Sequence, residues 1–361
     1  MKRPTIADIA SRAGVTKAAV SFALNGQPGV SAATRQRILA IAQEIGFQPN
    51  SAARALSDGR AGAFGLVIDR PARTLGVEPW FMQLISGIQG ELSTDHTALL
   101  FTMAEDQDAE IAMYRSWWAQ RRVDGIFLVD LQIGDLRVPV LEDLRMPAVV
   151  IGTPAGAGSL PAVWQDDAAA TQAVVEYLAA VGHRRVARVA GITRFWHTKI
   201  RTDAFTAAAR AAGVEPLLME ADYTGENGAA ATRRLLQSSA PPTAILYDND
   251  LMAVAGLGAA QQIGVSVPGD LSIVAWDDSP LCEFIHPPLT ALTRDIAAYG
   301  AHAARALGQV ADGVAVRNFE ESPPVLTIRG STGPAPGVPG REPSRAPGRE
   351  PTRWPPAGGR D

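Results

Sequence analysis

The feature that most constrains the fold of this chain is a regular alternation of short apolar runs and Ala-rich helical segments between residues 62 and 330. The apolar runs predict strands at 64–68, 98–103, 125–129, 148–151, 186–190, 244–247 and 272–275. Helical patterns lie between them, for example at 107–120, 168–181, 198–212, 226–238 and 250–263. Such alternation predicts βαβ units in a mixed α/β fold, and this number of strands requires two parallel sheets. The expected ligand pocket is a cleft at the carboxyl ends of both sheets.

The first 60 residues differ from the rest in charge. They carry eight Lys or Arg against three Asp or Glu, a formal charge of +5, which leaves −9 on the remainder. A basic head on an acidic body indicates that only the head meets a polyanion.

This head is also patterned as short helices. Thr5, with Asp8 three residues later, marks the start of a first helix, and Gly14 supplies the turn after it. A second helix is predicted at 16–24 and a third at about 31–45. Two helices joined by a Gly-containing turn, the second short and exposed, are typical of a helix-turn-helix. An ordinary helical pair is the alternative.

The head carries the runs TIADIA at 5–10, AGVT at 13–16, VS at 20–21 and LNG at 24–26. With their continuation to Leu56, these runs resemble the heads of the LacI/GalR family of transcription repressors. The resemblance extends over residues 4–330. It implies an all-helical head (residues 1–60), and a body (residues 62–330) of two Rossmann-like α/β lobes of the periplasmic-binding-protein type I.

The resemblance implies a role for each residue of the DNA-binding surface. The second helix is expected in the major groove, with Lys17, Ala18 and Phe22 nearest the base edges. Phe22 cannot pair with guanine as Arg does, but it suits contact with a thymine methyl group. Phosphate contacts that fix the register are expected from Thr5, Thr16, Ser21, Asn25, Ser31 and Thr34.

Residues 50–57 resemble the family's hinge helix. The resemblance implies that Asn50, Ala53 and Leu56 contact DNA there, and that Leu56 wedges into a base step of the minor groove. Eight residues are too few for a stable isolated helix, so the order of this segment should depend on DNA and on a dimer. A plain interdomain linker is the alternative.

In the body, the resemblance implies an effector site. Arg201, Asn249 and Asp277 align with effector-binding positions of the family, and a planar guanidinium and carboxylates suit sugar hydroxyls. Trp80 and Phe81 are expected to stack on an apolar sugar face.

Each of these body residues has an alternative role. Asp277 would otherwise cap a turn, Arg201 would form a surface ion pair and Trp80 would pack within its lobe. His197 is included among the effector contacts, with a bystander role as its alternative.

Other functions lack their signatures. There is no Walker loop, nucleophile elbow or full dinucleotide fingerprint, so we expect no enzyme and no cofactor. The five His residues are scattered, which predicts no metal site, and the single Cys282 fits a reducing compartment. No apolar segment is long enough for a membrane span, and no secretory signal is visible.

The sequence therefore predicts a cytoplasmic regulator, most simply a repressor. It is expected to bind a pseudo-palindromic operator as a homodimer, with a tetramer left open, and to respond to a sugar or sugar derivative. A transport receptor and an enzyme on α/β lobes are the competing classes. Residues 331–361 contain eight Pro and six Gly, which predicts a disordered tail.

Overall fold

The computed structural model describes residues 4–47, 60–70 and 76–337. The predicted hinge helix at 50–57 and the tail from residue 338 lie outside these ranges. No helix within them is long and apolar enough to cross a membrane.

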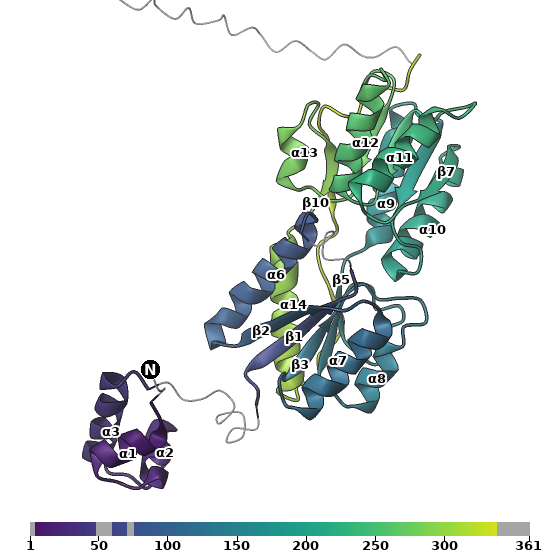
Figure 1. Cartoon of the computed structure of the whole chain (residues 1–361). Coiled ribbons are helices and arrows are strands. Elements are labelled where there is room, and N and C mark those ends of the chain that lie inside the picture. The colour runs from purple at the N-terminus through teal and green to yellow at the C-terminus, as the bar shows by residue number, and fades with distance from the viewer. Residues whose placement is uncertain (1–3, 48–59, 71–75, 338–361) are drawn as a thin grey trace, which may run out of the picture.

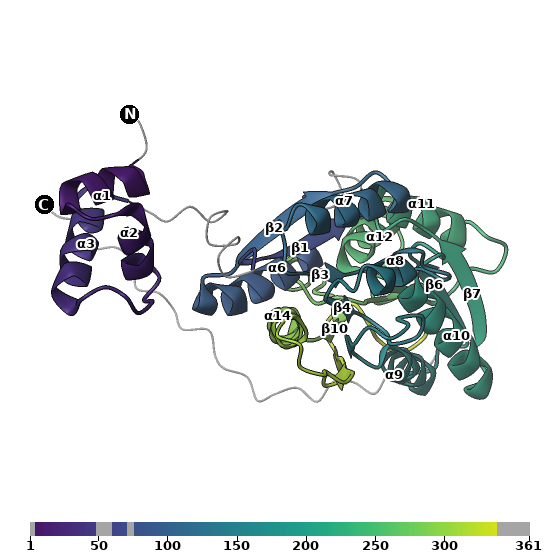
Figure 2. The same cartoon turned by 90° about the horizontal axis from the view of Figure 1, so that it is seen from below.

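The head consists of three helices packed on one another (Figure 2). They are α1 (Ile6–Ala13), α2 (Lys17–Leu24) and α3 (Ala32–Glu44), each within two residues of its predicted bounds. Their shared core is apolar and small, because only one face of each short helix is buried. Its fully buried members are Ile9, Ala10, Ala13, Val20, Ala23, Ile38 and Ala42.

The first lobe is built on a six-stranded sheet in the order β11-β5-β4-β3-β1-β2. All its pairs are parallel, and the strands span, in that order, Phe319–Glu320, Ala162–Trp164, Ala148–Ile151, Gly125–Leu128, Ala63–Ile68 and Ala98–Met103. Helices α6 (Pro79–Leu92) and α14 (Ile296–Ala311) cover one face. Helices α7 (Gln107–Ala119) and α8 (Arg137–Asp143) cover the other, and the short 3-10 turn η1 (Ser93–Asp95) follows α6 (Figure 1).

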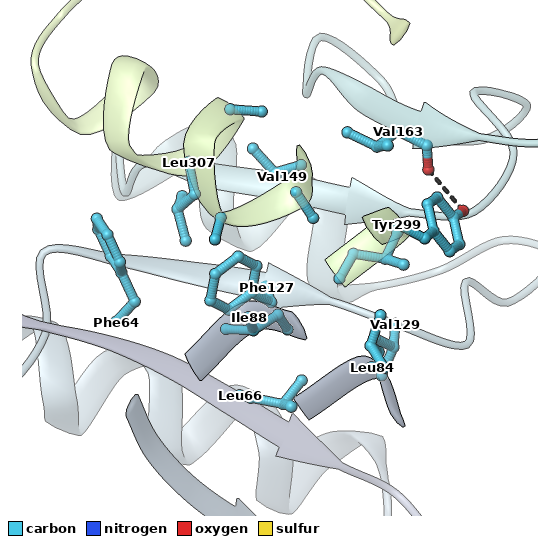
Figure 3. Packing of buried hydrophobic residues seen from close by; sticks show 14 of the residues in the cluster. Phe64, Leu66, Leu84, Ile88, Phe127, Val129, Val149, Val163, Tyr299 and Leu307 are labelled. Carbon is cyan, nitrogen blue, oxygen red and sulfur yellow. Dashed lines mark hydrogen bonds between the residues drawn. The ribbon is translucent and has the colours of Figure 1, made fainter. Parts of the chain in front are cut away.

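The central strands of this sheet are buried on both faces, as parallel strands between helices must be. Along β1, Phe64, Leu66 and Ile68 pack under α6 and α14, whereas Val67 packs under α7. Figure 3 shows the first of these clusters, in which the hydroxyl of Tyr299 donates to the carbonyl oxygen of Val163 at 2.7 Å. This bond ties α14 to β5, close to the passage between the lobes.

The second lobe repeats this plan with the strand order β12-β10-β9-β8-β6-β7. These strands span Val325–Thr327, Thr290–Thr293, Ser272–Ala275, Ala244–Tyr247, Arg185–Ala190 and Glu215–Glu220, and only β12 is antiparallel to its neighbour within the described chain. Helices α9 (Asp167–Ala180) and α10 (Trp196–Ala211) cover one face. Helices α11 (Gly225–Leu236), α12 (Asp250–Gln262) and α13 (Pro280–Phe284) cover the other (Figure 1).

The chain passes between the two lobes three times, after β5, after β10 and after β11. The predicted α/β class with two parallel-sheet lobes is confirmed, and all seven predicted strands are present within one residue of their bounds. Strands β5, β7, β10, β11 and β12 were not predicted. Four of them have only two to four residues, and β7 (EPLLME) has a proline at its second position and a glutamate at each end.

Residues 331–337, beyond the predicted boundary at residue 330, contact the second lobe. Ser331 and Thr332 are buried in the second lobe, where Ser331 Oγ donates to the carbonyl oxygen of Ile273 at 2.6 Å. The amide of Ala335 donates to Val181 O at 3.0 Å. Composition did not reveal these specific hydrogen bonds, which fix residues 331–337 to the lobe despite their Pro and Gly content.

Candidate functional site

Helix α2 presents the face that the sequence assigns to DNA. Lys17, Ala18 and Phe22 are exposed on it, while Val20 and Ala23 are buried against α1 and α3. The exposed residues are therefore not part of the head core, and their side chains can approach a base edge.

Three of the six predicted phosphate-binding residues are the N-cap residues of the head helices. Thr16 Oγ1 accepts the Ala19 amide and Ser31 Oγ accepts the Thr34 amide, both at 3.2 Å. The Thr5 amide donates to the Asp8 carboxylate at 2.8 Å, which begins α1. Free amides and the helix dipole make such N-termini suited to phosphate. Of the remaining predicted contacts, Asn25 is exposed, and Ser21 and Thr34 are half-buried.

The loop after α2 is held by two side chains. The ring of Phe22 lies over Gly29, so closely that a Cβ there would be 3.3 Å from the ring. Arg35 donates to the carbonyl oxygen of Gln27. Phe22 is thus anchored on one edge while the rest of its ring stays open. Predicted contacts Asn50, Ala53 and Leu56 lie outside the described residues.

A polar cavity lies between the lobes, at the carboxyl ends of the parallel strands. Its wall includes five of the six predicted effector residues, namely Trp80, Phe81, His197, Arg201 and Asp277. The loops after β1, β3, β4 and β5 supply the first-lobe side, and those after β6, β7, β8 and β9 supply the second.

Arg201 is fixed in place within the wall. Its Nε donates to Asp167 at 2.8 Å, and its guanidinium lies 3.7 Å from the ring centroid of Trp276. The side chain is only 7% exposed, so this is a buried ion pair and not a surface one. The remaining guanidinium nitrogens are available for a ligand in a geometry set before binding.

Asp277 sits opposite a second arginine. Its carboxylate accepts from Arg294 at 2.7 Å, and Arg294 also donates to Gln165 at 3.0 Å. Arg294 and Gln165 lie where the chain passes between the lobes, so Asp277 connects the cavity to two of the segments that join the lobes.

Arg70 connects the two lobes across the cavity. From the first lobe, Asp130 accepts from its Nε at 2.9 Å. From the second lobe, the rings of Phe195 and Tyr223 lie 4.8 and 4.5 Å from the guanidinium carbon. Asp130 and Tyr223 both have left-handed backbone angles, with φ of 51° and 69°, a conformation that non-glycine residues adopt at a cost.

His197 lines the cavity as a neutral group. Burial, followed by the nearby charge of Arg201, lowers the pKa of His197 to about 4. Its Nε2 lies 2.7 Å from the hydroxyl of Tyr223. At neutral pH the imidazole therefore offers hydrogen bonds without charge.

Asn249 is the predicted effector residue that does not line the cavity. Its Oδ1 accepts the Met252 amide at 2.9 Å as the cap of α12, and its Nδ2 donates to Tyr223 O at 3.0 Å. Through this second hydrogen bond, Asn249 holds the backbone of Tyr223, which lines the cavity. Phe81 is 1% exposed and belongs largely to the first-lobe core, whereas Trp80 both packs on that core and lines the cavity.

Several polar atoms of cavity-lining residues have no hydrogen-bond partner within the described chain. They are Arg70 Nη1, Glu78 Oε2, Trp80 Nε1, Trp196 Nε1, Asp248 Oδ1 and Arg294 Nε. Buried polar groups are normally paired, and each one left without a partner costs about 1–3 kcal/mol. This concentration of unpaired donors and acceptors around one cavity indicates a polar ligand.

Sequence reasoning missed Arg70, Glu78, Asp130, Tyr223 and Arg294 in the cavity wall. Arg70 and Asp130 come within two residues of predicted strands, so the rule that ligands bind beyond strand ends would have found them. Tyr223 and Arg294 follow β7 and β10, which were not predicted, so the sequence held no signal for them.

A helix-turn-helix head joined to two α/β lobes around a polar cavity defines a DNA-binding regulator with a ligand-binding body. Residues 5–50 match the family of bacterial regulatory proteins, lacI family, and residues 175–332 match the family described as a periplasmic binding protein-like domain. The chain is 33% identical to the HTH-type transcriptional regulator reg1 of Streptomyces lividans, over 93% of this chain and 99% of that one.

Solved structures agree with this match. A lac repressor dimer bound to operator and the anti-inducer ONPF superimposes with a TM-score of 0.83 at 25% identity, over 92% of this chain and 100% of that one. A complex of the transcriptional regulator CelR with cellobiose gives a TM-score of 0.70 at 28% identity, over 91% and 100%. The chain belongs to the lacI family and is a DNA-binding transcriptional regulator.

Proposed function

We propose that this regulator binds a pseudo-palindromic operator as a cytoplasmic homodimer, acts as a repressor, and changes its operator affinity when a small sugar-like effector enters the interlobe cavity. The solved relatives that bind operator, ONPF or cellobiose support this assignment. The family match supports a regulatory role, and on this proposal the chain is not an enzyme.

The observation that carries the effector assignment is the set of unpaired polar atoms around the cavity. A sugar offers hydroxyl groups that both donate and accept, so a sugar in this cavity can pair with the polar side chains of its wall. The indole of Trp80 supplies an apolar surface beside them.

The coupling to DNA follows from where the effector contacts lie. Arg201 and Asp277 belong to the second lobe, while Trp80 and Arg70 belong to the first. A ligand that contacts both favours one lobe arrangement, and it shifts operator affinity by its difference in affinity for the two arrangements, commonly about 1–3 kcal/mol. On this proposal the segment with Asn50, Ala53 and Leu56 transmits the change to DNA, with Leu56 as a minor-groove wedge.

The DNA-binding assignment is tested with two basic residues of the head. Lys17 is exposed on α2, whereas Arg12 on α1 pairs with Glu44 at 3.2 Å. Lys17→Ala should weaken binding to an operator fragment, and the loss of its positive charge beside the DNA should flatten the log-affinity against log-salt slope by up to about 0.9. Arg12→Ala is the control and should leave the slope unchanged. Fluorescence anisotropy at several salt concentrations measures both; equal behaviour of the two variants would sink the assignment.

A further inference from the structure

Glu78 is a cavity residue whose carboxyl group has no partner. It lies at the N-terminus of α6, is 6% exposed and lines the cavity between the lobes. Oε2 is buried without a hydrogen bond, and no hydrogen bond or ion pair of this side chain occurs in the described parts of the chain. A buried carboxyl in this state is destabilising, so its retention in a ligand cavity suggests a contact made only when the ligand is present.

The other carboxylates of the wall are already engaged. Asp130, Asp167 and Asp277 pair with Arg70, Arg201 and Arg294 at 2.7–2.9 Å. Asp248 pairs with Arg188 behind the wall, and Asp166 accepts the Ala169 amide, at 2.7 and 2.9 Å. Among the described carboxyl groups of the lining, Glu78 is the one whose side chain has neither a hydrogen bond nor an ion pair.

The same pairing leaves the cavity without a free positive charge. The described lining holds three arginines, each neutralised by its own carboxylate, beside six acidic residues. A phosphate or carboxylate entering this space would lose its hydration and find no unpaired cation, which is strongly unfavourable. A hydroxyl or amino group would find Glu78.

We propose that Glu78 binds a hydroxyl or amino group of the effector and that the acidic wall restricts the effector to uncharged or amine-bearing sugars. Phosphorylated and acidic sugars are excluded. This inference rests on the proposed function, because it assumes that the cavity is the effector site, and it adds the charge class of the effector and the residue that selects it.

The protonation of Glu78 fits this role. Burial raises the pKa of Glu78 to about 8 despite the opposing charge of Arg70, while Asp130, Asp277 and Asp250 raise it further. Near neutral pH the carboxyl is therefore largely protonated, so it donates through its O–H and accepts through its carbonyl oxygen. An amine placed beside it takes up the proton, and the two groups form an ion pair.

Calorimetric titration of the full-length protein at pH 7 tests the charge class. The probes are glucose, galactose, maltose and cellobiose, with glucosamine, glucose 6-phosphate, galactose 6-phosphate and gluconate. We expect at least one neutral or amino sugar to bind, and its phosphorylated or acidic counterpart to bind at least about a hundredfold more weakly, because the anion loses its hydration and finds no unpaired cation in the cavity. An anionic member that binds as tightly as its neutral counterpart, or a panel without any neutral or amino binder, overturns the proposal.

Variants of Glu78 test the residue itself. Glu78→Ala should weaken the bound sugar by about tenfold or more, whereas Glu78→Gln should retain a neutral sugar within about threefold because the amide also donates and accepts. Glu91→Ala, on the same helix but in a surface pair with Arg305, is the control and should bind normally. Melting curves of all variants verify folding. Wild-type affinity in Glu78→Ala contradicts the assignment.

An operator-binding measurement on the same samples separates this inference from the proposed function. A neutral sugar that binds through Glu78 but leaves operator affinity unchanged supports the site and overturns the regulatory role of that sugar. A sugar phosphate that binds in the cavity and releases the operator supports the proposed regulatory function and overturns the inference about Glu78 and the charge of the effector.

Discussion

At the scale of single residues, the cavity is organised before any ligand arrives. Arg201 is fixed by Asp167 and Trp276, and Asp277 is fixed by Arg294. Their orientations therefore need little reordering on binding, which lowers the entropic cost of holding a small ligand. The donor and acceptor atoms of Arg201 and Asp277 that are not used in these pairs can bind an effector, so effector affinity is the property to test.

Replacing Asp277 should remove the effector response. In Asp277→Asn the charge opposite Arg294 is lost, and effector affinity should fall by about 1–3 kcal/mol because a charged hydrogen bond is removed. Operator binding without effector should stay near wild type, since the head is unchanged. Calorimetry with the bound sugar and anisotropy with operator DNA measure the two properties. Asp203→Asn, in an exposed pair with Lys199, is the control; an unimpaired response in Asp277→Asn would place the effector elsewhere.

Glu78 should make the stability of the free protein depend on pH. Its pKa is about 8 in the folded chain against 4.5 for the free side chain, so the folded state holds a proton that the unfolded state has released. Stability should therefore fall as pH rises from about 4.5 to about 8, by at most about 5 kcal/mol at 1.36 kcal/mol per pKa unit. The loss is complete above that window.

The variant Glu78→Gln should lack this component. His197, whose pKa of about 4 lies below its ordinary 6.5, has the opposite effect between those two values, so the comparison must be between variant and wild type. Urea unfolding at pH 5, 7 and 9 gives the difference. Parallel stability profiles for the two proteins would show that Glu78 does not retain its proton in the folded state.

At the scale of elements, the packing of α6 on α14 depends on two glycines. A Cβ on Gly87 would overlap the carbonyl oxygen of Ala297, and one on Gly300 would overlap that of Leu84. The two helices therefore approach with backbone against backbone on one face of the first sheet (Figure 1). Both helices begin beside the cavity.

Gly87→Ala should destabilise the first lobe. The added methyl group forces the helices apart at a typical cost of about 1–3 kcal/mol, which outweighs the roughly 1 kcal/mol that Ala gains over Gly in a helix. Gly90→Ala is a matched control, because Gly90 lies on the same helix, is exposed, and a methyl group added there would meet no atom within 4 Å. Thermal unfolding should lower the melting temperature for the first variant and raise it slightly for the second; the same shift in both would exclude close packing as the reason.

At the scale of the whole molecule, exposed apolar side chains predict where a second copy would dock in the proposed homodimer. Strand β2 is an edge of the first sheet and leaves Phe101 and Met103 exposed, and α6 beside it exposes Met82. In the second lobe, Phe284 on α13 is 81% exposed. Large apolar side chains on an unpaired edge are unfavourable in water and favour association.

The double variant Phe101→Asp/Phe284→Asp should be monomeric at micromolar concentration, because it places charges in an apolar interface. Its operator affinity should also fall, since two linked heads are needed to occupy two half-sites. Leu218→Asp is the control and should remain dimeric, because Leu218 is the single exposed apolar side chain of edge strand β7, whose ends are the exposed Glu215 and Glu220. Sedimentation velocity distinguishes the states; a dimeric double variant would place the interface elsewhere.

The sequence alone determined the local structure and the class of the protein. The caps at Thr5, Thr16 and Ser31 define the helices of the head, and the apolar runs define the buried parallel strands, because both signals act over a few neighbouring residues. The family motif identified Arg201 and Asp277 as candidate site residues, but it gave no information on their positions or contacts.

Only the tertiary structure decided which side chains share the cavity. Arg70 is held by Asp130 of its own lobe and by Phe195 and Tyr223 of the other, from segments far apart in sequence. The side chain of Asn249 caps α12 and does not line the cavity. Glu78 has no hydrogen-bond partner, because its neighbours pair with other groups. Hydrogen-bond partners, burial and the resulting pKa depend on the packing of both lobes together, and no local pattern in a single sequence records that packing.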